Sequence, residues 1–364
     1  MENRRIEILD GFRALAILMV LSFNYFSRWT PPRWTSNYYP YGGKYAEFPL
    51  FNFGFLGVEF FFVISGFVIS LTLFGSRSIR EFVAKRIARL WPAMFICSLI
   101  TLIALVAIPQ TMFEAKIRNL VPSLLFIDPY LLQKVFGISS NWMDNAYWSL
   151  FVEVRFYFWA AIIYFSFPKR FLEAFSAFSA GVLMVFLTGK FCVTQVQTAT
   201  DLIFFPAYVA WFLMGVGFYH LYENKKTRLA HSVIAASLLV QWLKVWFKEL
   251  HGSGSSVMIG HSVAFGLIVL VFYGFVYRPK WLACFGWSFV SQVGAASYSL
   301  YLLHQNLGVA LIRYASERFG FPGEIVTVCV MGLLIVGAIG IYRYWEIPAK
   351  KLVLRLLLPR AGVV

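Results

Sequence analysis

The chain is a succession of apolar runs, each long enough to cross a lipid bilayer as a helix, separated by short polar and basic segments. With 60% hydrophobic and only 13% charged residues, a soluble domain of 364 residues could not bury so much apolar surface. The sequence predicts an all-α, polytopic membrane bundle of about ten helices, a single integral-membrane domain over 1–364 with no soluble appendage. The expected spans are roughly 8–28, 52–74, 91–109, 146–166, 170–189, 203–222, 229–247, 258–277, 288–312 and 324–345.

Basic residues give the expected bundle its orientation. The formal net charge is +15, and the clearest basic groups lie between alternate pairs of apolar runs: Arg77 to Arg89, Lys169/Arg170, Lys225/Lys226 and Arg278/Lys280. Basic loops stay on the cytoplasmic side of a membrane, so ten spans place both termini there. Topology therefore accounts for the positive charge, and we expect the lipid bilayer, not a nucleic acid, as the partner.

Two polar residues stand out inside the first apolar run. Arg13 and Asn24 are eleven residues apart, almost three helical turns, so their side chains share one face about 16 Å apart along the axis. An arginine inside an apolar segment is costly and usually marks a functional site. The structural alternative is an ion pair with Asp10, one turn earlier.

Polar residues near the predicted cytoplasmic side form a basic group. Arg86 and Arg89 in KRIARLWP are three residues apart and share a helical face. Together with Arg13 they could bind phosphates through paired hydrogen bonds. The alternative is that these arginines only anchor their spans.

A second polar group is expected in the outer half of the bundle, made of Asn24, Glu59, Glu153 and His304. A carboxylate at membrane depth must be paired or neutral, and either state changes its acidity. The group could therefore do acid–base chemistry. Each residue also has a purely structural alternative. Glu59 could form a hydrogen bond that only joins two helices, and Glu153 could belong to an aromatic belt at the membrane interface. His304 could be an interior residue whose hydrogen bonds are satisfied within the protein. The cysteines lack the spacing of metal ligands, and we expect no metal.

Several segments resemble, in order, the membrane acyltransferase-3 family: LDGFRALAILMVLSF, FGFLGVEFFFVISGFVIS, RIARLWPAM, YWSLFVEVRFY, WFLMGVGFY, ASYSLYLLHQ and YRYWEIPAK. The resemblance implies a bundle in the bacterial cytoplasmic membrane. Such a protein moves an acetyl or other short acyl group from cytoplasmic acyl-CoA to a hydroxyl of an envelope polysaccharide or lipid-linked sugar. It also implies that Arg13, Arg86 and Arg89 serve the donor, and that a histidine at the position of Asn24 acts near the thioester.

Asn24 departs from that pattern. An amide forms hydrogen bonds but accepts no proton near neutral pH, and loss of a general base typically costs about 10²–10⁴-fold in rate. Three interpretations stay open: an inactivated enzyme, an enzyme whose base is another residue such as His304 or Glu59, or a catalytically dead binding protein. A secondary transporter or flippase would show similar polar residues. Acyl-CoA binding separates these classes best.

Two long loops on the predicted outer side, roughly 29–51 and 110–145, suggest a route for the acceptor. Trp29, Trp34, Tyr38 and Tyr39 could stack against sugar rings there, or could simply anchor the interface. We further expect Glu59, or failing that Glu153, to lie beside Asn24.

Overall fold

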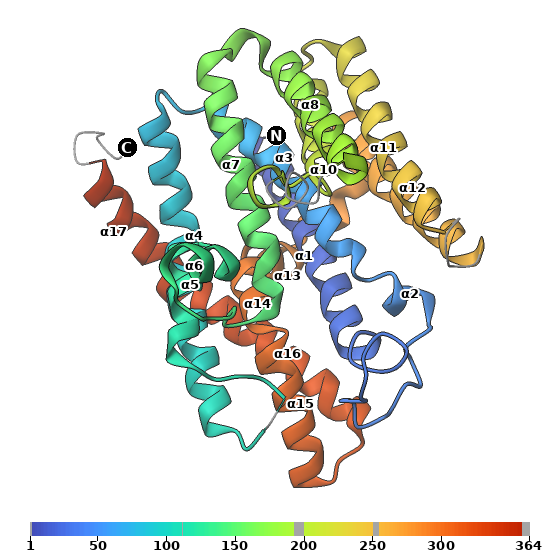
Figure 1. The fold of residues 1–364 in the computed structure, drawn as a ribbon, viewed down its shortest axis with the longest axis vertical. Coiled ribbons are helices and arrows are strands. Elements are labelled where there is room, and N and C mark those ends of the chain that lie inside the picture. The colour runs from blue at the N-terminus through green and yellow to red at the C-terminus, as the bar shows by residue number, and fades with distance from the viewer. Residues whose placement is uncertain (1, 111, 193–199, 250–254, 359–364) are drawn as a thin grey trace. The chain divides into compact units, whose positions relative to one another are not determined.

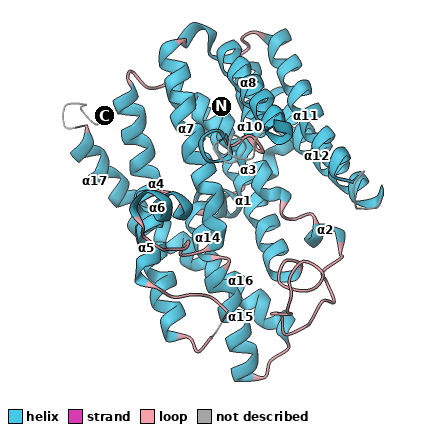
Figure 2. Cartoon of the chain, in the orientation of Figure 1, coloured by secondary structure: helices cyan, strands magenta, loops and turns pink. Residues whose placement is uncertain are grey.

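The protein is helical throughout the part that the structure describes. The computed structural model covers residues 2–110, 112–192, 200–249 and 255–358, and no strand occurs within these ranges (Figure 2). Helices and their connecting turns account for the described fold, which confirms the expected all-α class.

Nine helical segments of the described chain are long and apolar enough to span a membrane. The predicted span at 288–312 is instead three short helices, α13 (Ser288–Ala295), α14 (Ser297–Leu303) and α15 (Asn306–Phe319). The sidedness of the bundle stays a prediction from charge. The candidate spans are Glu7–Phe26, Leu56–Phe74, Ile79–Ala107, Asn145–Ser166, Pro168–Thr188, Thr200–Tyr222, Thr227–Phe247, Met258–Tyr277 and Gly323–Leu357.

The chain folds into two compact units, each built from separate stretches of sequence. The helices that make up these units are labelled in Figure 1. Unit 1 contains Met1–Ile8, Val58–Phe82 and Val152–Cys284, and unit 2 contains Leu9–Gly57, Val83–Phe151 and Phe285–Val364.

Unit 1 has an aromatic core between the later parts of α3 (Leu56–Phe74) and α7 (Trp148–Ser166) and four further helices. The rings of Phe156 and Phe212 stack with their centroids 4.1 Å apart. Aromatic rings bury large areas, so such stacks dominate the packing. The four further helices are α8 (Phe171–Cys192), α10 (Val209–Tyr222), α11 (Thr227–Glu249) and α12 (Ser255–Tyr277), with α10 packed on α8, α11 and α12.

Glycine lets α3 and α10 approach closely. A Cβ added at Gly66 would lie 2.2 Å from the carbonyl oxygen of Phe212, and one at Gly215 would lie 2.1 Å from that of Val63. Only a residue without a side chain fits such a backbone contact.

Unit 2 is built on α1 (Glu2–Phe26), α4 (Ile79–Ala107) and α16 (Gly323–Ile341), together with α13, α14 and α15. Gly54 and Gly57 face the carbonyls of Met19 and Ala16 on α1, again too close for a Cβ. The short elements of this unit are α2 (Pro49–Asn52), η1 (Ile117–Asn119), α5 (Leu120–Leu125), α6 (Pro129–Phe136) and η2 (Asn145–Tyr147).

The C-terminal end of α16 changes its winding. Tyr342–Glu346 forms a single π-helical turn before α17 (Ile347–Leu357), in which Pro348 occupies the first turn. Proline has no N–H to donate, and a wider turn accommodates the register change. Such turns are common at functional sites, and this one carries Glu346 toward the polar interior of unit 2.

Gly66→Ala should destabilise the protein although alanine is the better helix former. Its Cβ meets the Phe212 carbonyl, and overpacking typically costs about 1–3 kcal/mol. Gly337→Ala is the matched control, because nothing lies within 4 Å of its added Cβ and the helix gains roughly 0.5–1 kcal/mol. Thermal unfolding in detergent should show a lower midpoint for the first variant only. A midpoint unchanged or raised by Gly66→Ala would contradict the close contact.

Candidate functional site

Three helices of unit 2 bring four cations together. Arg13 lies on α1, Arg86 and Arg89 lie on α4, and Lys350 lies on α17. The charges of the three arginines all act on Lys350, so the side chains occupy one electrostatic neighbourhood. We call these four residues the basic cluster. The structure thus brings together the three arginines singled out in the sequence and adds Lys350.

Two carboxylates partly balance the basic cluster. Asp10 forms an ion pair with Arg13, with Oδ1 and Nη1 2.5 Å apart. Glu346 interacts electrostatically with Lys350 and accepts a hydrogen bond of 2.6 Å from the Ser299 hydroxyl. Four cations against two carboxylates leave an excess of two positive charges, which suits a ligand with several phosphates.

A buried carboxylate organises the second polar region of unit 2. Asp144, fully buried just before η2, accepts hydrogen bonds from the backbone N–H of Ala146 at 2.8 Å and of Asn306 at 2.7 Å. It also accepts one from Gln305 Nε2 at 3.1 Å. Asp144 therefore caps α15 from a distant part of the sequence. Burial raises the pKa of Asp144 to about 7, although the two N–H donors and the Arg28 charge oppose the shift.

His304 lies at the break between α14 and α15 and has no exposed surface. Its Nδ1 is 2.6 Å from the carbonyl oxygen of Tyr301, and its own carbonyl accepts a 2.7 Å hydrogen bond from the Tyr25 hydroxyl. Its Nε2 is buried without a hydrogen-bond partner among the described residues. The ring is therefore held by one nitrogen and leaves the other available.

Asn24 and Arg28 approach the same region from the end of α1. Asn24 is 4% exposed, and its Nδ2 donates to the Val20 carbonyl at 3.0 Å. Asn24 Oδ1 and Arg28 Nε are both buried and lack partners in the described part of the chain. The Arg28 charge acts on both Asp144 and His304. We call Asn24, Arg28, Asp144 and His304 the buried polar centre.

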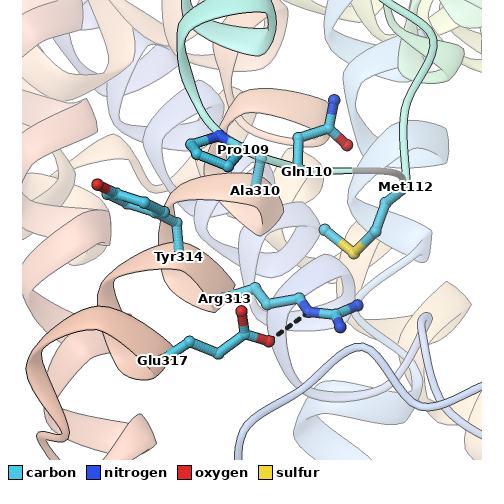
Figure 3. A pocket seen from close by; sticks show the side chains of 7 residues that line it. All are labelled: Pro109, Gln110, Met112, Ala310, Arg313, Tyr314 and Glu317. Carbon is cyan, nitrogen blue, oxygen red and sulfur yellow. Dashed lines mark hydrogen bonds and ion pairs between the residues drawn. The ribbon is translucent and has the colours of Figure 1, made fainter.

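A cavity of about 440 Å³ lies beside α15 (Figure 3). Arg313 and Glu317 form an ion pair of 2.7 Å at its side, and Tyr314 presents its ring. The Arg313 guanidinium also lies 6.0 Å from the ring centre of Tyr38, in the loop 29–51. The lining residues are Pro109, Gln110, Met112, Ala310, Arg313, Tyr314 and Glu317.

The aromatic residues of that loop divide into two kinds. Trp29 and Tyr39 are buried, and the Tyr39 hydroxyl bonds to the backbone of both Trp29 and Asn24. Their predicted stacking on sugar rings is therefore wrong, because they hold the loop to α1. Trp34, 38% exposed, and the half-buried Tyr38 stay accessible.

The two predicted carboxylates belong to unit 1. Glu153 accepts hydrogen bonds from the hydroxyls of Ser65 and Tyr157. Arg155, two residues further along α7, donates to the carbonyls of residues 201 and 202. Glu59 Oε2 is buried without a partner among the described residues. That either carboxylate neighbours Asn24 stays a prediction, because Asn24 belongs to unit 2.

Arg28 and Asp144 were not singled out in the sequence. Arg28 sits just beyond the first apolar run, where a basic residue is normally an anchor, and Asp144 lies in a long loop among other polar residues. An acidic residue directly before a helical turn is the local signal of a cap. Nothing local indicates that Asp144 caps α15, more than 150 residues later.

Comparison of the sequence with known protein families agrees with the membrane fold described above. A family model described as an acyltransferase domain matches residues 6–343. The chain belongs to this acyltransferase-3 family, and it is an integral membrane protein.

Two relatives of the chain are named as O-acetyltransferases. The chain is similar to the O-acetyltransferase OatA of Staphylococcus aureus (strain NCTC 8325 / PS 47), 23% identical over 385 residues, which cover 94% of this chain and 57% of OatA. It is also similar to a protein of Bacillus subtilis (strain 168), provisionally named peptidoglycan O-acetyltransferase YrhL, 28% identical over 168 residues, covering 43% of this chain and 23% of YrhL. The chain thus spans just over half of OatA. No solved structure matches it.

Asp144→Ala should destabilise the protein strongly. It removes the acceptor of three buried donors, and each unsatisfied buried donor costs about 1–3 kcal/mol. Asp128→Ala is the matched control, because Asp128 caps α6 at the surface through the Tyr130 N–H and such a cap contributes about 1 kcal/mol. Thermal unfolding in detergent should separate the two variants clearly. Equal shifts would mean that Asp144 does not hold the start of α15.

Proposed function

We propose that this membrane acyltransferase takes an acetyl or other short acyl group from cytoplasmic acyl-CoA. It transfers the group to a hydroxyl of an envelope polysaccharide or lipid-linked sugar in the bacterial cytoplasmic membrane. The proposal is supported by the family, by relatives named as O-acetyltransferases, and above all by the convergence of the basic cluster from three helices.

The donor end of the proposal is electrostatic. Coenzyme A carries several phosphate charges, and arginine forms paired hydrogen bonds to phosphate oxygens. In this proposal Arg13, Arg86 and Arg89 bind those phosphates, and Asp10 and Glu346 fix the orientation of the cations. The extended pantetheine arm then carries the thioester along α1 toward Asn24.

The acceptor end lies at the loops that the sequence suggested. The cavity beside α15 is lined by Pro109, Gln110 and Met112 and by residues of α15, and its Arg313 contacts Tyr38 of the other loop. A tyrosine ring and an ion pair are groups that bind sugar rings and hydroxyls. We therefore assign the acceptor glycan to this side.

We propose that acyl transfer by this chain is slow because position 24 is an asparagine. Acyl transfer to an alcohol needs a group that takes the hydroxyl proton, and an amide does not do so near neutral pH. Asn24 keeps a buried acceptor oxygen in the polar centre, so donor and acceptor still bind. Glu59 and Glu153 of unit 1 are the carboxylates that we propose for acid–base chemistry.

The donor proposal is tested by removing two charges from α4. Arg86→Gln/Arg89→Gln should weaken acetyl-CoA binding to the purified protein by roughly 10²-fold, since hydrogen bonds to charged groups contribute about 1.5–3 kcal/mol each. The salt dependence of binding should also flatten. Arg77→Gln/Arg80→Gln removes the same charge from exposed positions at the start of α4 and should leave the affinity within about threefold. Equal losses in both double variants would contradict a specific site.

The role of position 24 is tested by restoring a base. Asn24→His should raise acyl transfer from acetyl-CoA to peptidoglycan fragments by about 10²-fold or more, because a general base contributes about 10²–10⁴-fold. Asn24→Gln, which keeps an amide, should bring no increase. Transfer is measured in proteoliposomes from the labelled acetyl group. Acetyl-CoA binding without any transfer in Asn24→His would identify the chain as a binding protein on this scaffold.

A further inference from the structure

Three buried polar atoms of the polar centre have no hydrogen-bond partner among the described residues: Asn24 Oδ1, Arg28 Nε and His304 Nε2. Buried polar groups are nearly always satisfied, and an exception calls for an explanation such as a missing ligand. Here two acceptors and one charged donor are left over in one region. That set is complementary to a ligand carrying both an acceptor oxygen and a hydroxyl donor.

The hydrogen bonds of His304 fix which nitrogen carries its proton. A carbonyl oxygen can only accept, so Nδ1 must donate to Tyr301 across 2.6 Å. In the neutral ring Nε2 then holds a free lone pair. Because Nε2 is buried and unpartnered, the chain keeps a base in this centre that it does not use internally.

The hydrogen bond of Asn24 fixes its amide in the same way. Val20 offers a carbonyl, so the Asn24 NH₂ group donates to it, and Oδ1 is left as a buried acceptor without a partner among the described residues. This oxygen can accept a hydrogen bond from a hydroxyl but cannot remove its proton. It therefore suits orientation of an alcohol and not its activation.

Arg28 supplies the positive charge of the centre. Its charge acts on Asp144, Tyr39 and Tyr301, and it also acts on His304. The guanidinium lies 5.1 Å from the Trp29 ring centre, which limits its movement. Arginine stays protonated in proteins, so its free Nε–H is a charged donor inside a buried region. Such donors stabilise an oxyanion far more strongly than they do in water.

Resting on the proposed function, we propose that Arg28 binds the oxyanion of the acyl transfer and that His304 is the proton acceptor left in this chain. The acceptor hydroxyl gives its proton to His304 Nε2 as its oxygen bonds to the thioester carbon. The carbonyl oxygen becomes the oxyanion held by Arg28. The carbon–sulfur bond then breaks, and the imidazolium returns the proton to the leaving thiolate, giving the ester and free coenzyme A.

The environment of His304 explains why this route is slow. Burial and the Arg28 charge lower the pKa of His304 to about 4, although its bond to Tyr301 opposes the shift. A weaker base removes a hydroxyl proton less effectively. A histidine at position 24 would then open a second and faster route, whereas both routes would still form the same oxyanion.

Because both routes share the oxyanion but use different bases, the roles of Arg28 and His304 can be separated. Each variant is made in two backgrounds, the unsubstituted chain and Asn24→His. Arg28→Gln should lower kcat for acetyl transfer by about 10²–10³-fold in both, because an oxyanion donor is needed whichever base acts. His304→Gln should lower the slow transfer of the unsubstituted chain about 10²-fold, but should cost Asn24→His less than tenfold. Acetyl-CoA binding should stay unchanged in each folded variant, because the loss lies in the transfer step.

Arg28→Lys provides a second variant in case the glutamine disrupts folding. It keeps the charge but loses the planar donors, so kcat should fall less than with glutamine while KM stays the same. Full transfer by folded Arg28→Gln or Arg28→Lys, or equal losses from His304→Gln in both backgrounds, would overturn this assignment and leave the acyltransferase function standing. Absence of acetyl-CoA binding to the unsubstituted chain would instead count against the proposed function itself.

Discussion

A helix that begins inside an apolar bundle needs acceptors for its first N–H groups, and in unit 2 one carboxylate supplies them. Asp144 binds the N–H of Asn306 and the side chain of Gln305, so α14 can end at Leu303 and α15 can begin at Asn306. Without this cap the segment would gain from continuing as one helix.

The break decides how His304 is used. In an unbroken helix its carbonyl would accept from the N–H four residues later, but here it accepts from the Tyr25 hydroxyl. Gly308 makes room for that hydroxyl, since a Cβ there would lie 2.1 Å from it. The side chain of His304 is consequently held at a junction between α1, α14 and α15, where a ligand can be met by groups from several elements. A histidine within a regular apolar span would have no such neighbours.

Much of the fold could be predicted from the sequence, because membrane-spanning helices follow simple local rules of composition. Apolar runs identified nearly all the spans. The three-residue spacing of Gly54 and Gly57 is likewise a local signal for the close helix packing seen at these two positions. Arg13, Arg86 and Arg89 could be singled out because arginine is rare in such runs. Helical geometry also predicted that Arg86 and Arg89 share one helical face. The predicted span at 288–312 was wrong as a continuous helix, and the acid that caps α15 after its second break lies far away in the chain. Arg28 and Lys350 were missed for a similar reason, since a basic residue beside a span is usually only an anchor.

Position 24 is a place where a small exchange would keep a local hydrogen bond while removing a proton acceptor. Asn24 donates to the carbonyl four residues before it, Val20, on the same helix. His220 on α10 makes the same type of contact, with Nδ1 2.9 Å from the carbonyl of Val216, four residues before it. A histidine at position 24 could therefore keep the bond to Val20 through Nδ1–H. Its Nε2 would then extend beyond the position of the amide oxygen with a free lone pair, as Nε2 of His304 does. Asparagine reproduces the donor and the acceptor of that ring but not its basicity, so the fold around α1 has no reason to change when the two are exchanged.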